Sequence, residues 1–217
     1  MRIGRIFGLA ALIGLFAYRG LDYNGLDEAR LTKPYFESSS LIKDIRTGRE
    51  VRIEDSELSR YRALAYSTIA WSREHGNVIV VSKIPRRLEL FNKGKRERSF
   101  SIGLGGNPYD DKMYQGDFCT PEGIYEVVDK KEGKRTIFHK ALLLDYPRQE
   151  DNLEFLIAKQ RGLVPKGVNS PGGGIEIHGY GGDFDLSGGC ITMKNADIDE
   201  LFPRVRIGTP VVIVKAY

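Results

Sequence analysis

The stretch from residue 175 to residue 193, IEIHGYGGDFDLSGGCITM, carries the features that decide the fold and the chemistry of this chain. It begins with an alternating, strand-like run that ends at His178. Twelve residues later, Cys190 follows a Ser-Gly-Gly turn at residues 187–189. A thiol needs a nearby base to become a nucleophile near neutral pH. The pair therefore predicts a cysteine–histidine site for acyl transfer.

The order of these two residues narrows the choice of fold. Papain-like peptidases place the cysteine first and the histidine far downstream, whereas here His178 precedes Cys190. The adjacent glycines before the cysteine can adopt positive φ angles, so that successive N–H groups converge as an oxyanion hole requires. The competing hypothesis is a structural thiol, buried after a glycine turn, with a histidine that lies near it by coincidence.

Further segments extend these motifs into a family pattern. Residues 208–213 (GTPVVI), together with the Ile-His-Gly and Ser-Gly-Gly-Cys elements, resemble the YkuD-type L,D-transpeptidase catalytic domain. Residues 78–92 resemble its opening hairpin, residues 116–125 (GDFCTPEGIY) its Thr-Pro-x-Gly segment, and residues 141–147 (ALLLDYP) the strand that follows. The resemblance runs from residue 78 to residue 213, roughly two thirds of the chain.

This resemblance implies a specific chemistry. Such domains act on peptidoglycan stem peptides that contain diaminopimelate. A cysteine attacks the carbonyl of an L-centre donor residue, the terminal D-residue leaves, and an amine from a second stem or from a protein resolves the thioester. On this sequence, Cys190 would be the nucleophile and His178 the general base. The Gly179 carbonyl would orient the imidazole, and the N–H groups of Gly189 and Cys190 would form the oxyanion hole.

Four positions beside the pair are expected to bind substrate or shape the site. They are Ser187, Gly188, Tyr180 and Thr192. Ser187 matches the family's Ser/Thr and is expected to shape the turn. The other three depart from the common pattern, which has histidine in place of Gly188, arginine or asparagine in place of Thr192, and a small residue in place of Tyr180. Loss of the arginine removes a bidentate carboxylate clamp. Such variants resemble the branch that includes periplasmic murein hydrolases, so amine and water both remain open as acceptors.

Composition and charge describe an ordinary globular protein. The 217 residues suffice for one substantial core with a small appendage, and 41% of them are hydrophobic and 29% charged. The net charge of +4 suits weak attraction to anionic wall polymers or lipid headgroups and does not indicate nucleic-acid binding. The densest basic run, residues 93–98 (KGKRER), is expected to be a solvated hairpin turn.

The first twenty residues have the pattern of an export signal. Arg2 and Arg5 precede an apolar run at residues 6–18. As a helix this run would span only about 20 Å, less than a hydrocarbon core of about 30 Å. We expect residues 1–20 to be a cleaved signal peptide or an uncleaved inner-membrane anchor, with a buried N-terminal helix as the alternative. Export predicts a location in the periplasm or cell envelope.

A short helical segment and a β-rich domain follow. Residues 21–76 are expected to contain an amphipathic helix from Asp55 to near Gly76, and residues 77–217 to form the catalytic domain. Short β-branched runs between glycine and proline turns indicate a mainly β, α+β fold, which the resemblance specifies as a YkuD-like β-sandwich with a few helices. The expected strands are residues 78–83, 87–92, 99–104, 124–129, 141–146, 175–178 and 211–214. The expected helices are residues 149–161 and 197–202.

The other chemistry-bearing residues are given structural interpretations. Cys119 is expected to be a buried thiol, with a disulfide to Cys190, which would silence the nucleophile, as the alternative. His75 and His139 have no partners at metal-ligand spacing, so no metal and no cofactor are expected.

The loop between His178 and Cys190 contains two aspartates. Asp183 and Asp185 are expected to be solvated, unless one of them meets the amine of diaminopimelate.

Three hypotheses for the function result. The first is an exported L,D-transpeptidase that works through a Cys190 thioester, with the pKa of His178 near its ordinary value of about 6.5. The second is a murein hydrolase that uses the same pair with water as acceptor, on an amide such as one that anchors a protein to the wall. The third is a silent wall-binding module with a structural Cys190. An activated thiol would be alkylated quickly at pH 6–7, and a structural one would not.

Overall fold

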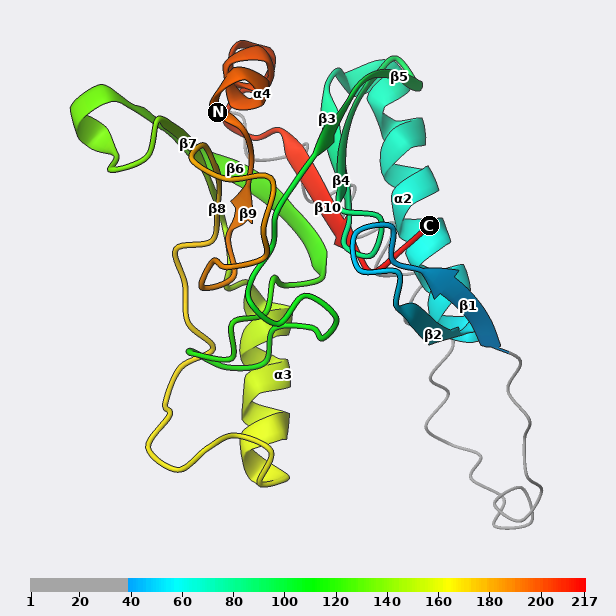
Figure 1. The fold of residues 1–217 in the computed structure, drawn as a ribbon, viewed down its shortest axis with the longest axis vertical. Coiled ribbons are helices and arrows are strands. Elements are labelled where there is room, and N and C mark those ends of the chain that lie inside the picture. Colours follow the sequence, from blue (N-terminus) through cyan, green and yellow to red (C-terminus); the bar gives the residue numbers. More distant parts are fainter. Residues whose placement is uncertain (1–38) are drawn as a thin grey trace.

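The computed structural model describes residues 39–217 (Figure 1). The predicted export segment, residues 1–20, and the first part of the predicted N-terminal segment lie outside the described residues. Between residues 39 and 217, no helix is both long and apolar enough to span a membrane.

Eight strands form one curled sheet (Figure 1). Its strands follow in the order β5 (Lys95–Ser101), β4 (Arg87–Asn92), β3 (Val78–Ser82), β10 (Pro210–Val214), β6 (Gly123–Glu132), β7 (Lys140–Leu144), β8 (Glu176–His178) and β9 (Ile191–Thr192). Neighbouring strands are antiparallel except in two pairs, β3 with β10 and β8 with β9. The predicted mainly β, α+β fold is confirmed.

The central strands β3 and β10 explain how the sheet holds together. Their sequences, VIVVS and PVVIV, are buried along the whole length, as expected for strands covered on both faces. One face joins the main core, which also contains Leu142, Ile177 and Ile191 from the far end of the sheet. The other face packs against α2 (Asp55–His75), through residues such as Tyr61 and Ala65.

The predicted helices are present within two residues of the expected bounds, as α2, α3 (Gln149–Gln160) and α4 (Asn195–Leu201). Acidic residues in the first turn of α2 and basic residues in its last turn complement the helix dipole. Two short 3₁₀ helices, η2 (Gly133–Arg135) and η3 (Phe202–Arg204), complete the helical elements of residues 39–217.

Two of the local features that differ from the sequence-based expectations lie outside the candidate site. The basic run at residues 93–98 is a turn only at Lys93 and Gly94, which both have positive φ, and the rest of the run belongs to β5. A two-residue turn of this conformation matches the twist of the paired strands and needs no longer loop. The second feature is an unpredicted hairpin of β1 (Ser39–Lys43) and β2 (Glu50–Glu54), which pair antiparallel ahead of α2.

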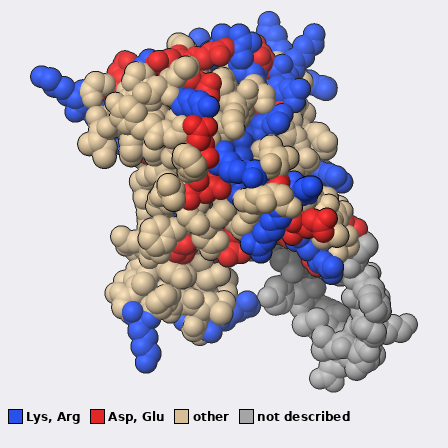
Figure 2. Space-filling model, in the orientation of Figure 1, with Lys and Arg blue, Asp and Glu red and all other residues tan. Residues whose placement is uncertain are grey.

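Charged side chains are distributed over the molecule with both signs intermixed. Figure 2 shows lysine and arginine beside aspartate and glutamate across the upper part of the face drawn. The lower lobe, over α3 and the loop that follows, is mostly uncharged there, and it exposes Leu153, Leu156 and Leu163.

Candidate active site

Strands β8 and β9 bring the predicted base and nucleophile to one pocket. The strands are parallel, with Ile177 opposite Ile191 and His178 opposite Thr192. Cys190 directly precedes β9. Since side chains two positions apart on a strand share a face, Cys190, Thr192 and His178 lie on the same side. All three line a cavity of about 570 Å³.

The ring of His178 is held by the backbone of the next residue. Its Nδ1 lies 2.7 Å from the carbonyl oxygen of Gly179. A carbonyl only accepts hydrogen bonds, so Nδ1 carries the proton and Nε2 of the neutral ring keeps a free lone pair. Burial lowers the pKa of His178 and outweighs the opposing effects of the Gly179 hydrogen bond and the Glu176 charge. The expected pKa near 6.5 is therefore too high, and the ring is neutral at pH 7.

Cys190 is half-buried and its thiol is protonated at rest. Its Sγ lies 3.6 Å from the carbonyl oxygen of Gly174, to which the thiol donates. Burial raises the pKa of Cys190, and a backbone hydrogen bond from Glu176 and the charge of Lys112 offset this only in part. The resting pair is thus a neutral thiol and a neutral imidazole. For such a pair we expect slow alkylation at pH 6–7, whereas the sequence-based hypothesis expected fast alkylation of an active thiol.

The turn before Cys190 is braced by Ser187. The Ser187 hydroxyl donates to the carbonyl oxygen of Cys190 at 2.6 Å and accepts the N–H of Gly189 at 3.1 Å. Of the two glycines only Gly189 has a positive φ, of 132°, and a Cβ there would lie 2.6 Å from the carbonyl oxygen of Cys119. Gly188 borders the cavity in open space. The N–H of Gly189, a predicted oxyanion donor, has Ser187 as its partner here.

The other two predicted contact residues play different parts. Thr192 is buried, and its Oγ1 accepts the N–H of Gly182 at 3.1 Å, so its hydroxyl supports the loop that precedes the turn. Tyr180 is exposed and has a positive φ of 63°, and its N–H donates to Asn195 Oδ1 at 2.9 Å. Both residues border the cavity, where the phenol of Tyr180 is accessible to a ligand.

The two aspartates of the loop differ sharply. Asp183 is exposed and lies 3.2 Å from Lys194 Nζ. Asp185 is largely buried and forms ion pairs with Arg86 at 2.9 Å and Arg46 at 3.2 Å. The expectation that both are solvated is wrong for Asp185, because two arginines distant in sequence fold against it.

Both cysteines are free. Cys119 is buried, its thiol donates to the carbonyl oxygen of Asp117 at 3.5 Å, and burial raises its pKa to about 12. This agrees with the expected buried thiol.

Sequence reasoning missed two side chains beside the pair. Phe138 stacks on His178, with ring centroids 3.5 Å apart. Glu176 is buried, accepts from Lys131 Nζ at 2.7 Å, and influences the pKa of both His178 and Cys190. Its position two residues before His178 on one strand was a usable signal. Phe138 gave none, because it lies in the connection between β6 and β7.

The remaining histidines are in structural contacts. The ring of His75 stacks on that of Trp71, with centroids 4.1 Å apart. His139 Nε2 lies 2.9 Å from Asp199 Oδ1. Among residues 39–217, no group of three or more His, Cys, Asp or Glu side chains is arranged to hold a metal ion.

Comparisons with known proteins agree on one family. The model of YkuD, the L,D-transpeptidase catalytic domain, matches residues 76–213. The probable L,D-transpeptidase YcfS of Escherichia coli (strain K12) is 28% identical over 152 residues, which is 63% of this chain and 43% of YcfS. The chain thus spans less than half the length of that relative.

Two solved structures match this chain at less than 25% identity and with TM-scores below 0.5. The helical cell shape determining protein Pgp2 from Campylobacter jejuni is 24% identical, with a TM-score of 0.47 over 65% of this chain and 48% of Pgp2. Bd1075 from Bdellovibrio bacteriovorus is 23% identical, with a TM-score of 0.46 over 64% of this chain and 48% of Bd1075.

Proposed function

Since this chain belongs to the YkuD family of L,D-transpeptidase catalytic domains, we propose that it is an acyl-transfer enzyme of the cell envelope that acts on peptidoglycan stem peptides. Cys190 is the nucleophile and His178 the general base. The substrates contain diaminopimelate and end in a D-residue.

In the first half of the reaction, Nε2 of His178 takes the thiol proton as Cys190 Sγ attacks the carbonyl carbon of the L-centre. The tetrahedral intermediate carries its negative charge on the former carbonyl oxygen. The N–H groups of Cys190 and Gly189 stabilise that charge, and the oxyanion replaces Ser187 Oγ as the acceptor of the Gly189 N–H. The intermediate collapses to a thioester. The departing amine of the D-residue takes its proton from His178.

In the second half, an amine of another stem attacks the thioester carbonyl. His178 accepts the proton of that amine, a new amide bond forms, and the sulfur leaves and is reprotonated. Because the imidazole is neutral before each attack, it works as a base in both halves.

One observation carries this proposal. His178 and Cys190 line the same cavity from adjacent parallel strands, and the 2.7 Å contact of Nδ1 with the Gly179 carbonyl leaves Nε2 as the basic nitrogen. A structural thiol would not need an oriented imidazole on the same face. The cavity of about 570 Å³ is large enough for several residues of an extended peptide.

Water is the second candidate acceptor, because Gly188 and Thr192 stand where the common family pattern has a second histidine and an arginine or asparagine, and the loss of the arginine changes how a stem can be held. The test is mass analysis of muropeptides incubated with the purified full-length chain, with Cys190→Ala as the control. Cysteine-dependent cross-linked dimers or exchange of the terminal D-residue support the transpeptidase. Cysteine-dependent shortening alone supports the hydrolase. Identical products from both proteins would refute the enzyme and leave the silent wall-binding module.

Export through residues 1–20 is part of this proposal, since the substrate lies outside the cytoplasm. A wall-anchored protein with a free amine is a second class of acceptor.

A further inference from the structure

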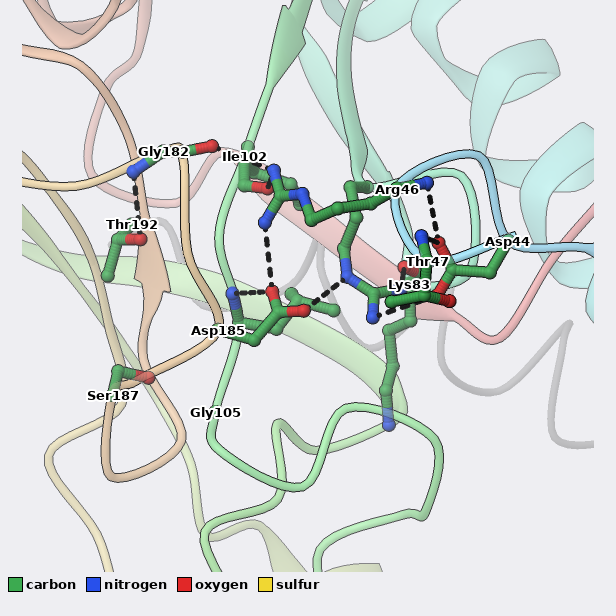
Figure 3. Close-up of polar contacts among 12 residues, drawn as sticks. Asp44, Arg46, Thr47, Lys83, Ile102, Gly105, Gly182, Asp185, Ser187 and Thr192 are labelled. Atoms are coloured by element: carbon green, nitrogen blue, oxygen red, sulfur yellow. Dashed lines mark hydrogen bonds and ion pairs between the residues drawn. The ribbon is translucent and has the colours of Figure 1, made fainter. Parts of the chain in front are cut away.

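The turn of the β1–β2 hairpin contacts the loop at residues 180–187, which precedes the candidate nucleophile Cys190. Arg46 lies in this turn, outside the region matched by the family model. Its guanidinium donates to the carbonyl oxygens of Ile102 at 2.8 Å and Gly182 at 2.9 Å, and to Asp185 Oδ1 at 3.2 Å. Figure 3 shows Arg46 extended from the hairpin toward all three acceptors. One side chain thus ties the hairpin to two separate segments of the domain.

A buried arginine completes this network. Arg86 is almost fully buried and lies between two carboxylates, 2.9 Å from Asp185 Oδ2 and 3.2 Å from Asp44 Oδ2. Asp44 in turn accepts the backbone N–H of Arg46 at 2.8 Å and of Thr47 at 3.2 Å, which fixes the hairpin turn. Two arginines and two aspartates therefore balance in charge across the junction.

The 180–187 loop forms one wall of the cavity beside Cys190. Its backbone is held on the inner side, where Gly182 accepts from Arg46 and donates to Thr192, and where Asp185 also accepts the N–H of Leu104 at 2.9 Å. On the outer side, Phe184 and Leu186 line the cavity and are largely exposed. The contacts of Arg46 with Gly182 and Asp185 thus lie on either side of Phe184 and directly before Leu186.

We propose that Arg46 is a positioning residue that holds the 180–187 loop as the substrate-facing wall of the pocket. This rests on the proposed function for what the pocket binds. Arg46 lies outside the region that the family model matches. The β1–β2 hairpin therefore helps to position the substrate-binding loop.

The clamp acts on binding more than on chemistry. Cys190 and His178 are held by the pairing of β8 with β9, and the turn is braced by Ser187. Ser187 is itself held by backbone hydrogen bonds with Leu104 and Gly106, and none of these contacts involves Arg46. Removing the guanidinium frees the loop wall and leaves the reacting groups in place. KM therefore rises while kcat changes little.

The test compares Arg46→Ala, Arg46→Lys and Arg52→Ala in the full-length chain. Arg52 is an exposed residue of the same hairpin and is the matched control. For Arg46→Ala we expect a rise in KM for a stem-peptide donor of about tenfold, as for the loss of one well-made charged contact, and a kcat within about threefold of wild type. Arg46→Lys keeps the charge but cannot reach three acceptors at once, so it is expected to restore part of the loss. Arg52→Ala is expected to match wild type.

A second readout needs no turnover. Hydrogen–deuterium exchange of peptides that cover residues 180–187 is expected to be faster in Arg46→Ala, with Arg46→Lys in between, while exchange in β3 and β10 stays unchanged. The alkylation rate of Cys190 by iodoacetamide is expected to stay at the wild-type value.

These outcomes separate the two proposals. If the wild type has no activity on muropeptides, the proposed function fails, and the exchange data still test the clamp. Unchanged exchange in residues 180–187, or a fall in kcat with unchanged KM, would overturn the positioning role. A rise in KM or in exchange for Arg52→Ala equal to that for Arg46→Ala would also overturn it. If Arg46→Ala unfolds, the same criteria apply to Arg46→Lys.

Discussion

Phe138 lies flat on His178, with ring centroids 3.5 Å apart and ring planes inclined by 16°. The connection between β6 and β7 thereby covers one face of the imidazole, while the Gly179 carbonyl fixes its edge. Stacking and hydrogen bonding together leave the ring a single orientation, and the same cover contributes to the burial that lowers the pKa of His178.

Replacing Phe138 by alanine is expected to lower kcat by about tenfold, because the stacking energy is lost and the imidazole of His178 is no longer held in one orientation. The acid limb of the pH profile is expected to move to higher pH, because His178 becomes more exposed and its pKa rises towards the ordinary value. Steady-state kinetics with Ile137→Ala as the control checks this, because Ile137 is the exposed neighbour. A Phe138→Ala enzyme with wild-type kcat and pH profile would show that the stacking is incidental.

The pH dependence follows from the directions of the two pKa shifts. His178 acts as a base only while it is unprotonated, so kcat/KM is expected to fall as the pH drops through a pKa below about 6.5. Burial raises the pKa of the Cys190 thiol, so alkylation of the free enzyme is expected to be slow at pH 7 and to accelerate above pH 9. Iodoacetamide kinetics across this range measures the second effect. Fast alkylation at pH 6 would mean a thiolate–imidazolium pair at rest instead.

The two glycines of the turn are expected to respond differently to alanine. At Gly189, a Cβ would lie 2.6 Å from a backbone oxygen and the φ of 132° disfavours any side chain, whereas at Gly188 nothing lies within 4 Å. Gly189→Ala is expected to lower kcat/KM by ~10²-fold, the typical cost of one oxyanion donor. Gly188→Ala is expected to stay within about threefold of wild type, as a substitution in open space. Equal losses in both variants would argue against Gly189 as an oxyanion donor.

A buried ion pair between Lys83 and Glu122 is hydrogen-bonded to α2 through Tyr61. Lys83 is fully buried and donates to Glu122 and to the carbonyl oxygens of Asp110 and Thr120, and Glu122 also accepts from the Tyr61 hydroxyl on α2. Lys83→Met is expected to lower the free energy of unfolding by about 3–5 kcal/mol, because the Glu122 charge is left uncompensated. Adding Glu122→Gln is expected to recover part of that loss. Urea denaturation measures both, and a loss below about 1 kcal/mol for Lys83→Met would contradict the account.

The sequence predicted those parts of the fold that local pattern encodes. The buried strands β3 and β10 and the helix α2 show in the sequence because β-branched runs and three- and four-residue apolar spacing reflect burial directly. Strand β9 has only two residues and the β1–β2 hairpin is half exposed, so neither carries a periodic signal.

The arrangement of the candidate site was predictable where its residues are close in sequence. His178, Gly179, Ser187 and Cys190 lie within thirteen positions of one another, and motif and spacing identify them. Asp185 was predicted to be solvated because its partners, Arg86 and Arg46, lie 99 and 139 positions away in the sequence. No local sequence pattern indicates such contacts. The pKa values of the pair likewise depend on burial, which arises only when the whole sheet forms.

The most direct test of the central claim is intact-protein mass spectrometry after brief mixing with a stem tetrapeptide that ends in a D-residue. Thioester formation predicts a mass gain equal to the donor minus the departing amino acid, located on Cys190 and removed by hydroxylamine. The adduct is expected to be absent in Cys190→Ala and slow to form in His178→Ala. No adduct on the wild type under turnover conditions, or the same adduct on Cys190→Ala, would contradict the assignment of Cys190 as the nucleophile.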